Sequence, residues 1–312
     1  MQKVLIIVGP TAVGKTKLGV ALSQQLNGEI ISGDSMQIYR EISVGTAKPA
    51  EAELAMARHH LVNELSVFDS YSVKDFVARA NAAIGQINAA KHLPLVVGGT
   101  GFYITALVNG LQLGEQETYD SPVDEQIEQY LVRAGPLALW QQLHEQDPQA
   151  AAKIPYQNTR RVMRALSVME RTGHPFSQQQ EQIAPLFDTK IIGLNTERAH
   201  LYDLINRRVD TMLEQGLLAE AEFIFTHKET IQQVKQAIGY KELFPYFEGE
   251  QTLDEAVAKL KQASRKYAKR QLTYFRNKMS VSWYDLTDYN PDAATDFAKI
   301  KQEVIEWLNN DK

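Results

Sequence analysis

Apolar runs alternate with segments of helical periodicity along the first hundred or so residues of the chain. Val4–Val8 and Leu93–Val97 are continuously apolar, as strands buried on both faces are, and Gly28–Ser32 is predicted as a further strand. Apolar residues that recur every three or four positions predict helices at Lys17–Leu26, Ser72–Ala90 and Phe102–Val108. This alternation predicts an α/β fold, in which a parallel sheet is flanked by helices on both sides.

The pattern changes after Gly114. The stretch Gly114–Pro122 is polar and contains turn formers, and Asp124–Gly173 is helical in pattern almost throughout. Lys190–Leu194 is predicted as another strand, and the chain after it is helical in pattern, with a weakly patterned tail from Asp288. We therefore predict one α/β core, residues 1–114 and 190–312, interrupted by a helical insertion domain, residues 115–189.

Composition narrows the class of protein. The 312 residues include no cysteine, which excludes Cys-based zinc sites, redox pairs and a disulfide framework. The apolar run Val4–Val8 is too short for a signal-peptide core or a membrane span, and no later segment is apolar enough to cross a bilayer. We expect a cytoplasmic protein that is monomeric and has no membrane partner.

Charge is distributed unevenly along the chain. The formal net charge of −5 disfavours a nucleic-acid partner, but the local field matters more than the total charge for binding a polyanion. Between Lys259 and Lys278 there are eight basic residues and no acidic one, and a second basic stretch comprises Lys153, Arg160, Arg161, Arg164 and Arg171 against Glu170 alone. Such runs are either phosphate-binding surfaces or solvated helix faces. The helical spacing of Tyr267, Tyr274 and Phe275 within the first run favours core packing over base stacking.

A phosphate-binding motif follows the first predicted strand. Gly9, Pro10, Thr11, Ala12, Val13, Gly14, Lys15 and Thr16 fit the pattern G-x-x-x-x-G-K-S/T at every fixed position. The glycines let backbone N–H groups turn toward an anion, and the helix that begins near Lys15 adds the positive end of its dipole. Lys15 supplies a point charge, and the Thr16 hydroxyl is a ligand for Mg²⁺. The motif predicts a P-loop NTPase-like core that binds a diphosphate group, and it does not by itself indicate ATP hydrolysis.

An acidic residue follows the second predicted strand. Asp34 lies just beyond Gly28–Ser32, and in a parallel α/β sheet the carboxyl ends of the strands face the ligand crevice. There its carboxylate would act as a general base or support Mg²⁺ indirectly, or else it would only cap the next turn. Gln37, three residues further on, offers a donor and an acceptor to the edge of a base.

Nine segments of the chain together resemble the bacterial tRNA dimethylallyltransferases, also called tRNA isopentenyltransferases. In chain order they are Gly9–Thr16, Asp34–Tyr39, Gly45–Pro49, His59–Leu61, Val97–Tyr103, Arg160–Leu166, Arg208–Leu213, Ala237–Glu242 and Ala268–Gln271. The resemblance spans nearly the whole chain. It implies transfer of a dimethylallyl group from dimethylallyl diphosphate to the exocyclic amine of the adenosine 3′-adjacent to the tRNA anticodon, with release of diphosphate.

The resemblance also implies roles for single residues. Lys15 and Arg208 would stabilise the departing diphosphate, Thr16 would hold Mg²⁺, and Asp34 would take the proton of the amine. Arg208 matches the family arginine that reaches the diphosphate, although Arg207 is adjacent. The target base would leave its stack, and the insertion would grip the anticodon stem-loop. The implied tRNA contacts are Asp34, Ser35, Met36, Gln37, Thr100, Gln157, Asn158, Thr159, Arg160, Arg161, Lys269 and Arg270.

The chain departs from the family pattern at one place in the predicted insertion. The family usually has His-Pro-Asn-Asp before the arginine of this region, whereas this chain has Pro155–Asn158. The arginines are retained and the polar tip differs, so this departure bears on the tRNA contact of residues 157–161. The chain also lacks the Cys/His zinc finger that eukaryotic relatives carry.

Two other functions share some of these features. A P-loop small-molecule kinase has the same cradle and the same parallel sheet, but it needs ATP as donor and a lid that carries arginines to the γ-phosphate. A nucleotide-gated RNA-binding protein has the cradle and the basic surface without any chemistry, and in it Asp34 only supports a metal.

Overall fold

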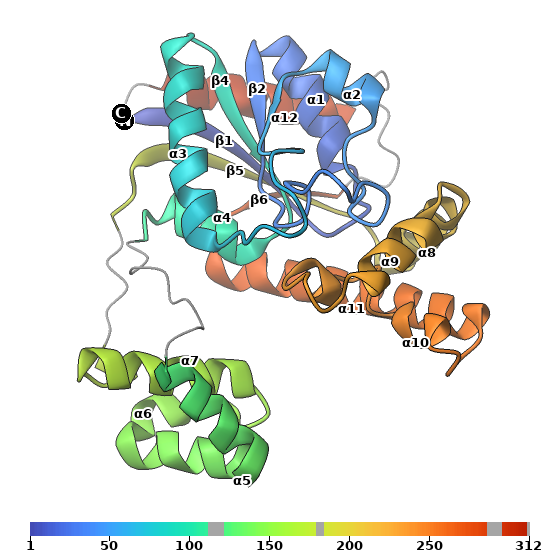
Figure 1. Cartoon of the computed structure of the whole chain (residues 1–312). Helices are drawn as coiled ribbons and strands as arrows, with labels where there is room; N and C mark the ends of the chain where they lie inside the picture. The colour runs from blue at the N-terminus through green and yellow to red at the C-terminus, as the bar shows by residue number, and fades with distance from the viewer. Residues whose placement is uncertain (112–121, 179–183, 286–294, 311–312) are drawn as a thin grey trace. The chain divides into compact units, whose positions relative to one another are not determined.

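A computed structural model describes residues 1–111, 122–178, 184–285 and 295–310 (Figure 1). The chain divides into two compact units: a core unit, Met1–Gly110 with Pro185–Lys312, and an insertion unit, Leu111–Ala184. In the ranges that the structure describes, no helix combines the length and the apolar character that crossing a bilayer requires.

A parallel sheet forms the centre of the core unit, as the sequence predicts. Its strands are β1 (Gln2–Val8), β2 (Gly28–Ser32), β3 (His59–His60), β4 (Leu93–Val97), β5 (Phe187–Asn195) and β6 (Ser282–Asp285). They lie in the order β3-β2-β4-β1-β5-β6, and every neighbouring pair is parallel. β2 and β4 have the predicted bounds, and β1 begins two residues before its predicted start at Val4.

The strand prediction needs three corrections. β3 and β6 were not predicted, because β3 has only two residues and β6 is a short edge strand without an apolar run. β5 begins at Phe187, not at Lys190, because Phe187 pairs with Gln2 at the end of the sheet. The residues before Lys190 from Pro185 on therefore belong to the core unit, and the predicted insertion boundary at residue 189 is wrong. The predicted boundary at residue 114 lies outside the described residues.

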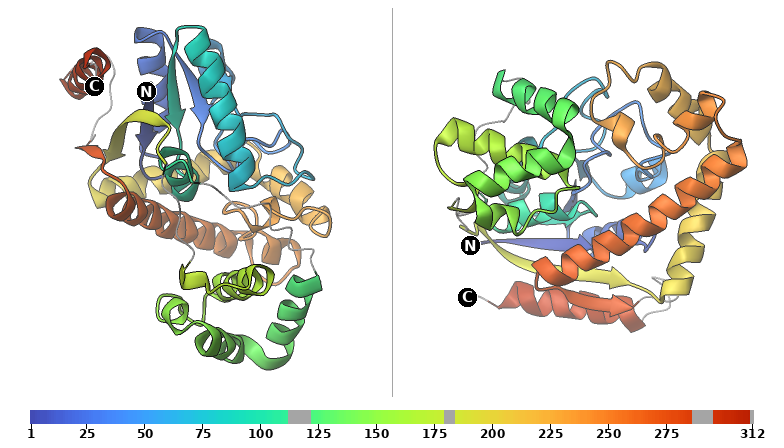
Figure 2. Two further views of the ribbon diagram at one scale, coloured as in Figure 1. Left: turned by 90° about the vertical axis from the view of Figure 1, so that its left-hand side faces the viewer. Right: turned by 90° about the horizontal axis from the view of Figure 1, so that it is seen from below.

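Helices cover both faces of the sheet, because side chains alternate along the strands (Figure 2). On β1, Val4, Ile6 and Val8 enter the core layer under α3, whereas Leu5 and Ile7 enter the layer under α1 and α12. The helices of the core unit are α1 (Lys15–Gln25), α2 (Glu51–Met56), α3 (Val73–Ala89), α4 (Gly101–Val108), α8 (Arg198–Glu214), α9 (Leu217–Thr226), α10 (Phe244–Phe247), α11 (Leu253–Lys278) and α12 (Thr295–Asn309), with a 3-10 turn at Val234–Gln236.

α12 lies in the tail that the sequence left without a clear pattern. It nevertheless contributes Phe297, Ile300 and Val304 to the core layer that it shares with α1. These three side chains recur at helical spacing, and Trp307 and Leu308 pack against the same layer, so the helix has an apolar face that was not predicted from the sequence.

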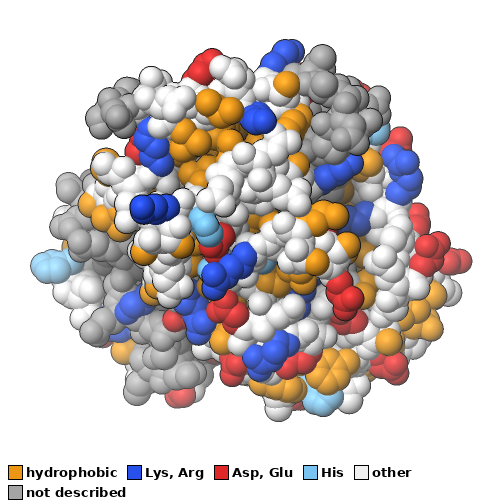
Figure 3. Space-filling view, turned by 90° about the horizontal axis from the view of Figure 1, so that it is seen from above, with side chains coloured by type: hydrophobic (Ala, Val, Ile, Leu, Met, Phe, Trp, Pro, Cys, Tyr) orange, Lys and Arg blue, Asp and Glu red, His pale blue; other side chains and the backbone are white. Residues whose placement is uncertain are grey.

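α11 is the longest uninterrupted helix of the core unit's described residues and crosses the carboxyl ends of the strands (Figures 1 and 2). It begins with a capping box between Thr252 and Glu255, and basic residues in its last turn complement the helix dipole. The predicted basic run lies on this helix. By contrast, the face drawn in Figure 3 intersperses lysine and arginine with aspartate and glutamate.

The insertion unit is helical, as the sequence predicts, and has its own small core. Its elements are α5 (Pro122–Gln146), α6 (Pro148–Ala151), α7 (Thr159–Thr172) and a 3-10 turn at Phe176–Gln178. α5 is kinked where Gly135, with φ of 84°, precedes Pro136. Leu139, Leu143 and Val162 are fully buried between α5 and α7, so the unit is held together by apolar packing of its own.

Candidate active site

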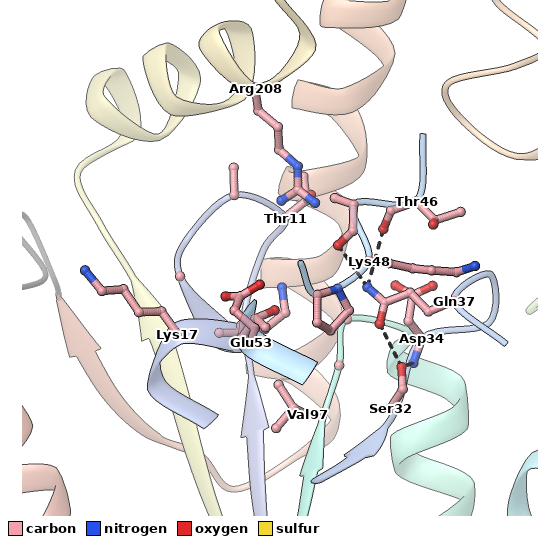
Figure 4. Close-up of a pocket in the computed structure, with 18 of the residues that line it drawn as sticks. Thr11, Lys17, Ser32, Asp34, Gln37, Thr46, Lys48, Glu53, Val97 and Arg208 are labelled. Atoms are coloured by element: carbon pink, nitrogen blue, oxygen red, sulfur yellow. Dashed lines mark hydrogen bonds between the residues drawn. The ribbon is translucent and has the colours of Figure 1, made fainter. Parts of the chain in front are cut away.

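A pocket of about 340 Å³ lies in the core unit at the carboxyl ends of the strands (Figure 4). The loop after β1 and the start of α1 form one wall, and the segment after β2 together with residues 46–49 forms another. α8 contributes Arg208, and α11 contributes Tyr267 and Gln271. Val97, Gly98 and Gly99 at the end of β4 complete the lining, so the pocket brings together segments that are far apart in the sequence, as expected for a ligand site of a parallel α/β sheet.

The loop Gly9–Thr16 has the geometry of a phosphate cradle. Gly9 has φ of 148°, and a Cβ there would lie 2.5 Å from the carbonyl oxygen of Leu194, so only glycine fits. Gly14 has φ of 91° and is the N-cap of α1, where no side chain caps the helix. The first N–H groups of α1 thus lie at the pocket, where they are available to an anion.

Lys15 is the buried cation of this cradle. Its ammonium donates a hydrogen bond of 2.7 Å to the carbonyl oxygen of Pro10. The pKa of Lys15 is lowered to about 7, mainly by burial and also by the positive charge of Arg208, while Asp34 acts in the opposite direction. An anion in the pocket would favour the charged form, so the protonation of Lys15 is coupled to anion binding.

Asp34 lies in the same pocket as the cradle. Its Oδ1 accepts a hydrogen bond of 2.9 Å from the backbone N–H of Met36, which fixes the carboxylate. Burial raises the pKa of Asp34, and the Met36 N–H, Lys15 and Arg208 oppose that rise. A carboxylate with a raised pKa is a better proton acceptor than an exposed aspartate. The bond to Met36 also caps the turn after β2, which was the alternative role predicted for Asp34. The same carboxylate can therefore cap this turn and face the pocket.

Arg208, not Arg207, faces the pocket. Arg208 reaches from α8 toward Thr11, as Figure 4 shows, whereas Arg207 is exposed on the other side of the helix. Burial lowers the pKa of Arg208, while Asp34 and Glu53 raise it, so the two carboxylates help to keep the guanidinium charged. The arginine in the pocket is thus the one that the resemblance predicted.

The predicted base-contacting residues after β2 are held by hydrogen bonds within the protein. The amide oxygen of Gln37 accepts from the Ser32 hydroxyl at 2.9 Å, and its Nε2 donates to the carbonyl oxygen of Ala47 at 3.2 Å. The Thr100 hydroxyl accepts a bond of 3.1 Å from the backbone N–H of Ser35. Asp34, Gln37 and Thr16 line the pocket, and Thr100 anchors the segment that carries Asp34.

Glu220 on α9 holds the loop that forms the second wall. One carboxylate oxygen accepts backbone N–H groups from Ser43 and Val44, the latter at 3.0 Å. The other accepts the Gly45 N–H and the Tyr240 hydroxyl, both at 2.7 Å. These bonds connect two segments, Gly45–Pro49 and Ala237–Glu242, whose roles the sequence did not assign. Four hydrogen bonds to one carboxylate make this loop a fixed wall of the pocket.

Some basic residues of α11 bind side chains of α8, and others are exposed to solvent. Lys261 forms an ion pair of 2.5 Å with Asp210, and Arg265 donates to Asn206 at 2.6 Å. Lys269 and Arg270 are exposed. Of the three aromatic residues on the same stretch, Phe275 is fully buried and Tyr274 packs against the core, as predicted, whereas Tyr267 borders the pocket.

The predicted contacts of the insertion lie at the start of α7. Asn158 is the N-cap of that helix, and its side chain accepts the backbone N–H of Arg161. Gln157, Arg160 and Arg161 are exposed, and Thr159 is half-buried. The altered tip of the sequence therefore still supplies a helix cap, with the arginine side chains on the surface of the insertion unit.

Comparison with known proteins shows that this chain is similar to tRNA dimethylallyltransferases. The family model described as IPP transferase matches residues 37–278. The tRNA dimethylallyltransferase of Lactobacillus gasseri is 59% identical and covers 91% of this chain and 92% of its own length. That of Enterococcus faecalis is 47% identical and covers 99% of this chain and 98% of its own length.

Solved structures agree with the sequence relatives. The full-length tRNA isopentenylpyrophosphate transferase of Bacillus halodurans superimposes with a TM-score of 0.74 at 43% identity, over 99% of this chain and 97% of that one. A eukaryotic dimethylallyltransferase acting on tRNA gives a TM-score of 0.80 at 28% identity, over 98% of this chain and 80% of that one.

Proposed function

The chain belongs to the IPP transferase family, and from this we propose how its pocket transfers a dimethylallyl group to tRNA. The protein is a tRNA-modifying prenyltransferase. We propose that its acceptor is the exocyclic amine of the adenosine 3′-adjacent to the anticodon, as the resemblance of its motifs implies. The observation that carries the mechanism is that Asp34, Lys15 and Arg208 share one pocket with the cradle. The binding site for the leaving diphosphate and the proton acceptor Asp34 therefore lie in the same pocket.

The cradle would hold the diphosphate of dimethylallyl diphosphate. As the carbon–oxygen bond of the donor breaks, negative charge grows on the diphosphate, and the backbone N–H groups of residues 12–16 would face it. Lys15 and Arg208 add two buried positive charges, which act more strongly in a site that excludes water than they would at the surface. The cradle would hold ATP as well, so we assign it to a leaving group because the chain belongs to a family of prenyltransferases.

Asp34 would accept the proton of the attacking amine. The nitrogen forms its bond to the allylic carbon, the bond from that carbon to the diphosphate oxygen breaks, and one N–H proton passes to the carboxylate. An adenine amine is a weak nucleophile, so removal of its proton and stabilisation of the leaving group are both needed. The raised pKa of Asp34 suits this role.

The residues also fit a bound magnesium ion. Mg²⁺ prefers oxygen ligands and keeps several waters, so it needs only one or two protein ligands beside phosphate oxygens. Thr16 lines the pocket and would supply the hydroxyl, with Asp34 nearby. Within the described residues no group of three or more acidic or histidine side chains forms a complete cage, which agrees with an ion held mainly by substrate. When bound, the ion would neutralise charge on the diphosphate.

The tRNA partner would meet both units. In the core unit, we assign the extruded adenosine to Asp34, Ser35, Met36, Gln37 and Thr100. Gln37 would exchange its bond to the Ala47 carbonyl for one to the base. Phosphates of the anticodon stem-loop would meet Lys269 and Arg270, and Gln157–Arg161 of the insertion unit. We propose that the enzyme works as a monomer, in the cytoplasm with its tRNA.

One assay tests the proposed function against its rivals. The protein is incubated with labelled dimethylallyl diphosphate and unmodified tRNA, with and without ATP. Transfer of label to tRNA without ATP supports the prenyltransferase. Consumption of ATP with a small-molecule acceptor, and no transfer of label, would instead indicate a kinase. Binding of tRNA with neither reaction would indicate an RNA-binding protein without chemistry.

Diphosphate binding at pH 8 is expected to draw a proton onto Lys15. The pKa of Lys15 is lowered to about 7, so at pH 8 the free amine is mostly neutral, and the bound anion favours the ammonium. At pH 6 the group is already charged and takes up none. Calorimetry in buffers of different ionisation enthalpy measures the proton change. Lys15→Met serves as the reference, because any proton change in this variant comes from the diphosphate itself. Equal proton uptake by the wild type and by Lys15→Met would contradict the expectation.

Charge reversal at Lys269 or Arg270 is expected to weaken tRNA binding and reduce its salt dependence. Each lost phosphate contact should lower the slope of log affinity against log salt by about one. Anticodon stem-loop affinity at several salt concentrations measures this slope. Lys91→Glu is the matched control, because Lys91 is an exposed lysine at the amino end of β4, whereas α11 crosses the carboxyl ends of the strands. A slope unchanged from wild type would show that neither residue meets a phosphate.

A further inference from the structure

The helix α11 packs along the glycine-rich loop that follows β4. Three of its side chains, at helical spacing, meet three successive residues of that loop. Tyr267 forms a side-chain hydrogen bond with Thr100, and Gln271 donates to the Gly99 carbonyl oxygen at 2.9 Å. Tyr274 lies against Gly101. One face of α11 therefore contacts the whole of this loop.

The glycines of the loop are explained by this packing. A Cβ at Gly99 would lie 2.2 Å from the amide nitrogen of Gln271, and a Cβ at Gly101 would lie 2.4 Å from the ring of Tyr274. Neither glycine has a positive φ, so backbone conformation is not the reason for glycine at these positions. Close approach of α11 requires glycine at both positions.

Gln271 joins this loop to the phosphate cradle. While its Nε2 donates to Gly99, its Oε1 accepts a hydrogen bond of 2.9 Å from the backbone N–H of Thr11. The side chain is only 5% exposed, so both bonds form away from water. A buried amide that satisfies a buried carbonyl and a loop N–H at once is costly to remove, because each partner then loses its bond.

We propose that Gln271 is a positioning residue that sets the conformation of the cradle for the diphosphate of the donor. The Thr11 N–H is committed to Gln271, so the first half of the loop is anchored to α11. The N–H groups from Ala12 to Thr16 are left to the anion. This inference rests on the proposed function, since it assumes that the anion is a diphosphate. It adds that the helix carrying Lys269 and Arg270 also shapes the donor site.

The first test replaces the hydrogen bonds while keeping the volume. Gln271→Met removes both bonds with a side chain of similar length, and Gln262→Met makes the same change at an exposed position of α11. Calorimetry with inorganic diphosphate and Mg²⁺ is expected to show binding about tenfold weaker in Gln271→Met, which is the size expected for two lost hydrogen bonds. Gln262→Met should bind as wild type does. Stem-loop affinity should stay within about twofold in both variants.

A second variant disturbs the hydrogen bonds of Gln271 without changing that residue. In Gly99→Ala the new Cβ displaces the Gln271 amide, so diphosphate binding should weaken by a similar factor. If both act through one contact, the double variant will be no worse than Gln271→Met alone. This cycle also distinguishes positioning from general damage, because two independent lesions would multiply their effects.

The outcomes separate the inference from the proposed function. If wild type itself does not bind diphosphate, the proposed function fails. If wild type binds and Gln271→Met binds equally well, the positioning role is wrong. It is also wrong if diphosphate and stem-loop affinities fall together with the melting temperature, or if the effects of the two substitutions multiply. In steady-state assays, the KM for the donor should rise in Gln271→Met while the KM for tRNA stays constant.

Discussion

Asp34→Asn is expected to slow dimethylallyl transfer by about 10²–10⁴-fold, the range that a positioned general base contributes. Asparagine keeps the shape of the side chain and can still accept the Met36 N–H, but it cannot take a proton from the amine. It also removes the negative charge between Lys15 and Arg208. Binding of diphosphate should therefore be retained or strengthened, and tRNA affinity should stay close to that of wild type.

Single-turnover transfer at saturating donor and tRNA separates this chemical effect from binding. Asp203→Asn is the control, since Asp203 is an exposed aspartate on α8 outside the pocket. A rate for Asp34→Asn near that of wild type would remove Asp34 from the base role. Loss of stem-loop binding in the same variant would point to a structural role instead.

The same residue predicts a pH dependence. Because burial raises the pKa of Asp34 above that of an exposed aspartate, the carboxylate is lost as the pH falls through this raised value. The single-turnover rate should therefore fall on the acid side at a higher pH than an unperturbed aspartate would give. Asp34→Asn should show no such acid limb, and an unchanged limb would assign it to another group.

Arg208→Gln is expected to lower kcat/KM for the donor by about 10²–10³-fold, the effect of removing one preorganised donor to a developing anion. The guanidinium is buried in the pocket and faces both Asp34 and Glu53, so its loss removes a cation that water cannot replace. Thermal unfolding should be measured alongside, because Asp34 and Glu53 then lose a positive neighbour.

Arg207→Gln provides a control in the adjacent position. Arg207 lies on the exposed side of α8 and should change donor kinetics by less than about twofold. Equal losses in the two variants would mean that the helix, not the pocket guanidinium, is responsible. Arg208 also lowers the pKa of Asp34, so the acid limb of the rate should move to higher pH in Arg208→Gln and stay in place in Arg207→Gln.

Local signals in the chain predicted the centre of the fold. β2 and β4 were predicted with their correct bounds, because a buried strand of a parallel sheet needs apolar or small residues over its whole length. The cradle was predicted for a similar reason. Its eight residues are contiguous, and its chemistry depends on glycines and a helix start that lie within the motif. The edge strands β3 and β6 have no continuous apolar run, because their side chains are only partly buried.

The sequence by itself determined which chemistry this protein has: a contiguous loop that binds phosphate, an acid after a strand, and a family pattern along the chain. The tertiary structure alone decided which side chains serve the pocket. It brings Tyr267 to the pocket, bonds Glu220 to the Gly45 N–H, and joins Gln271 to Thr11 across 260 residues of sequence. The physical reason is that hydrogen bonds and apolar contacts form between residues that are close in space. A sequence pattern describes only residues that are close along the chain.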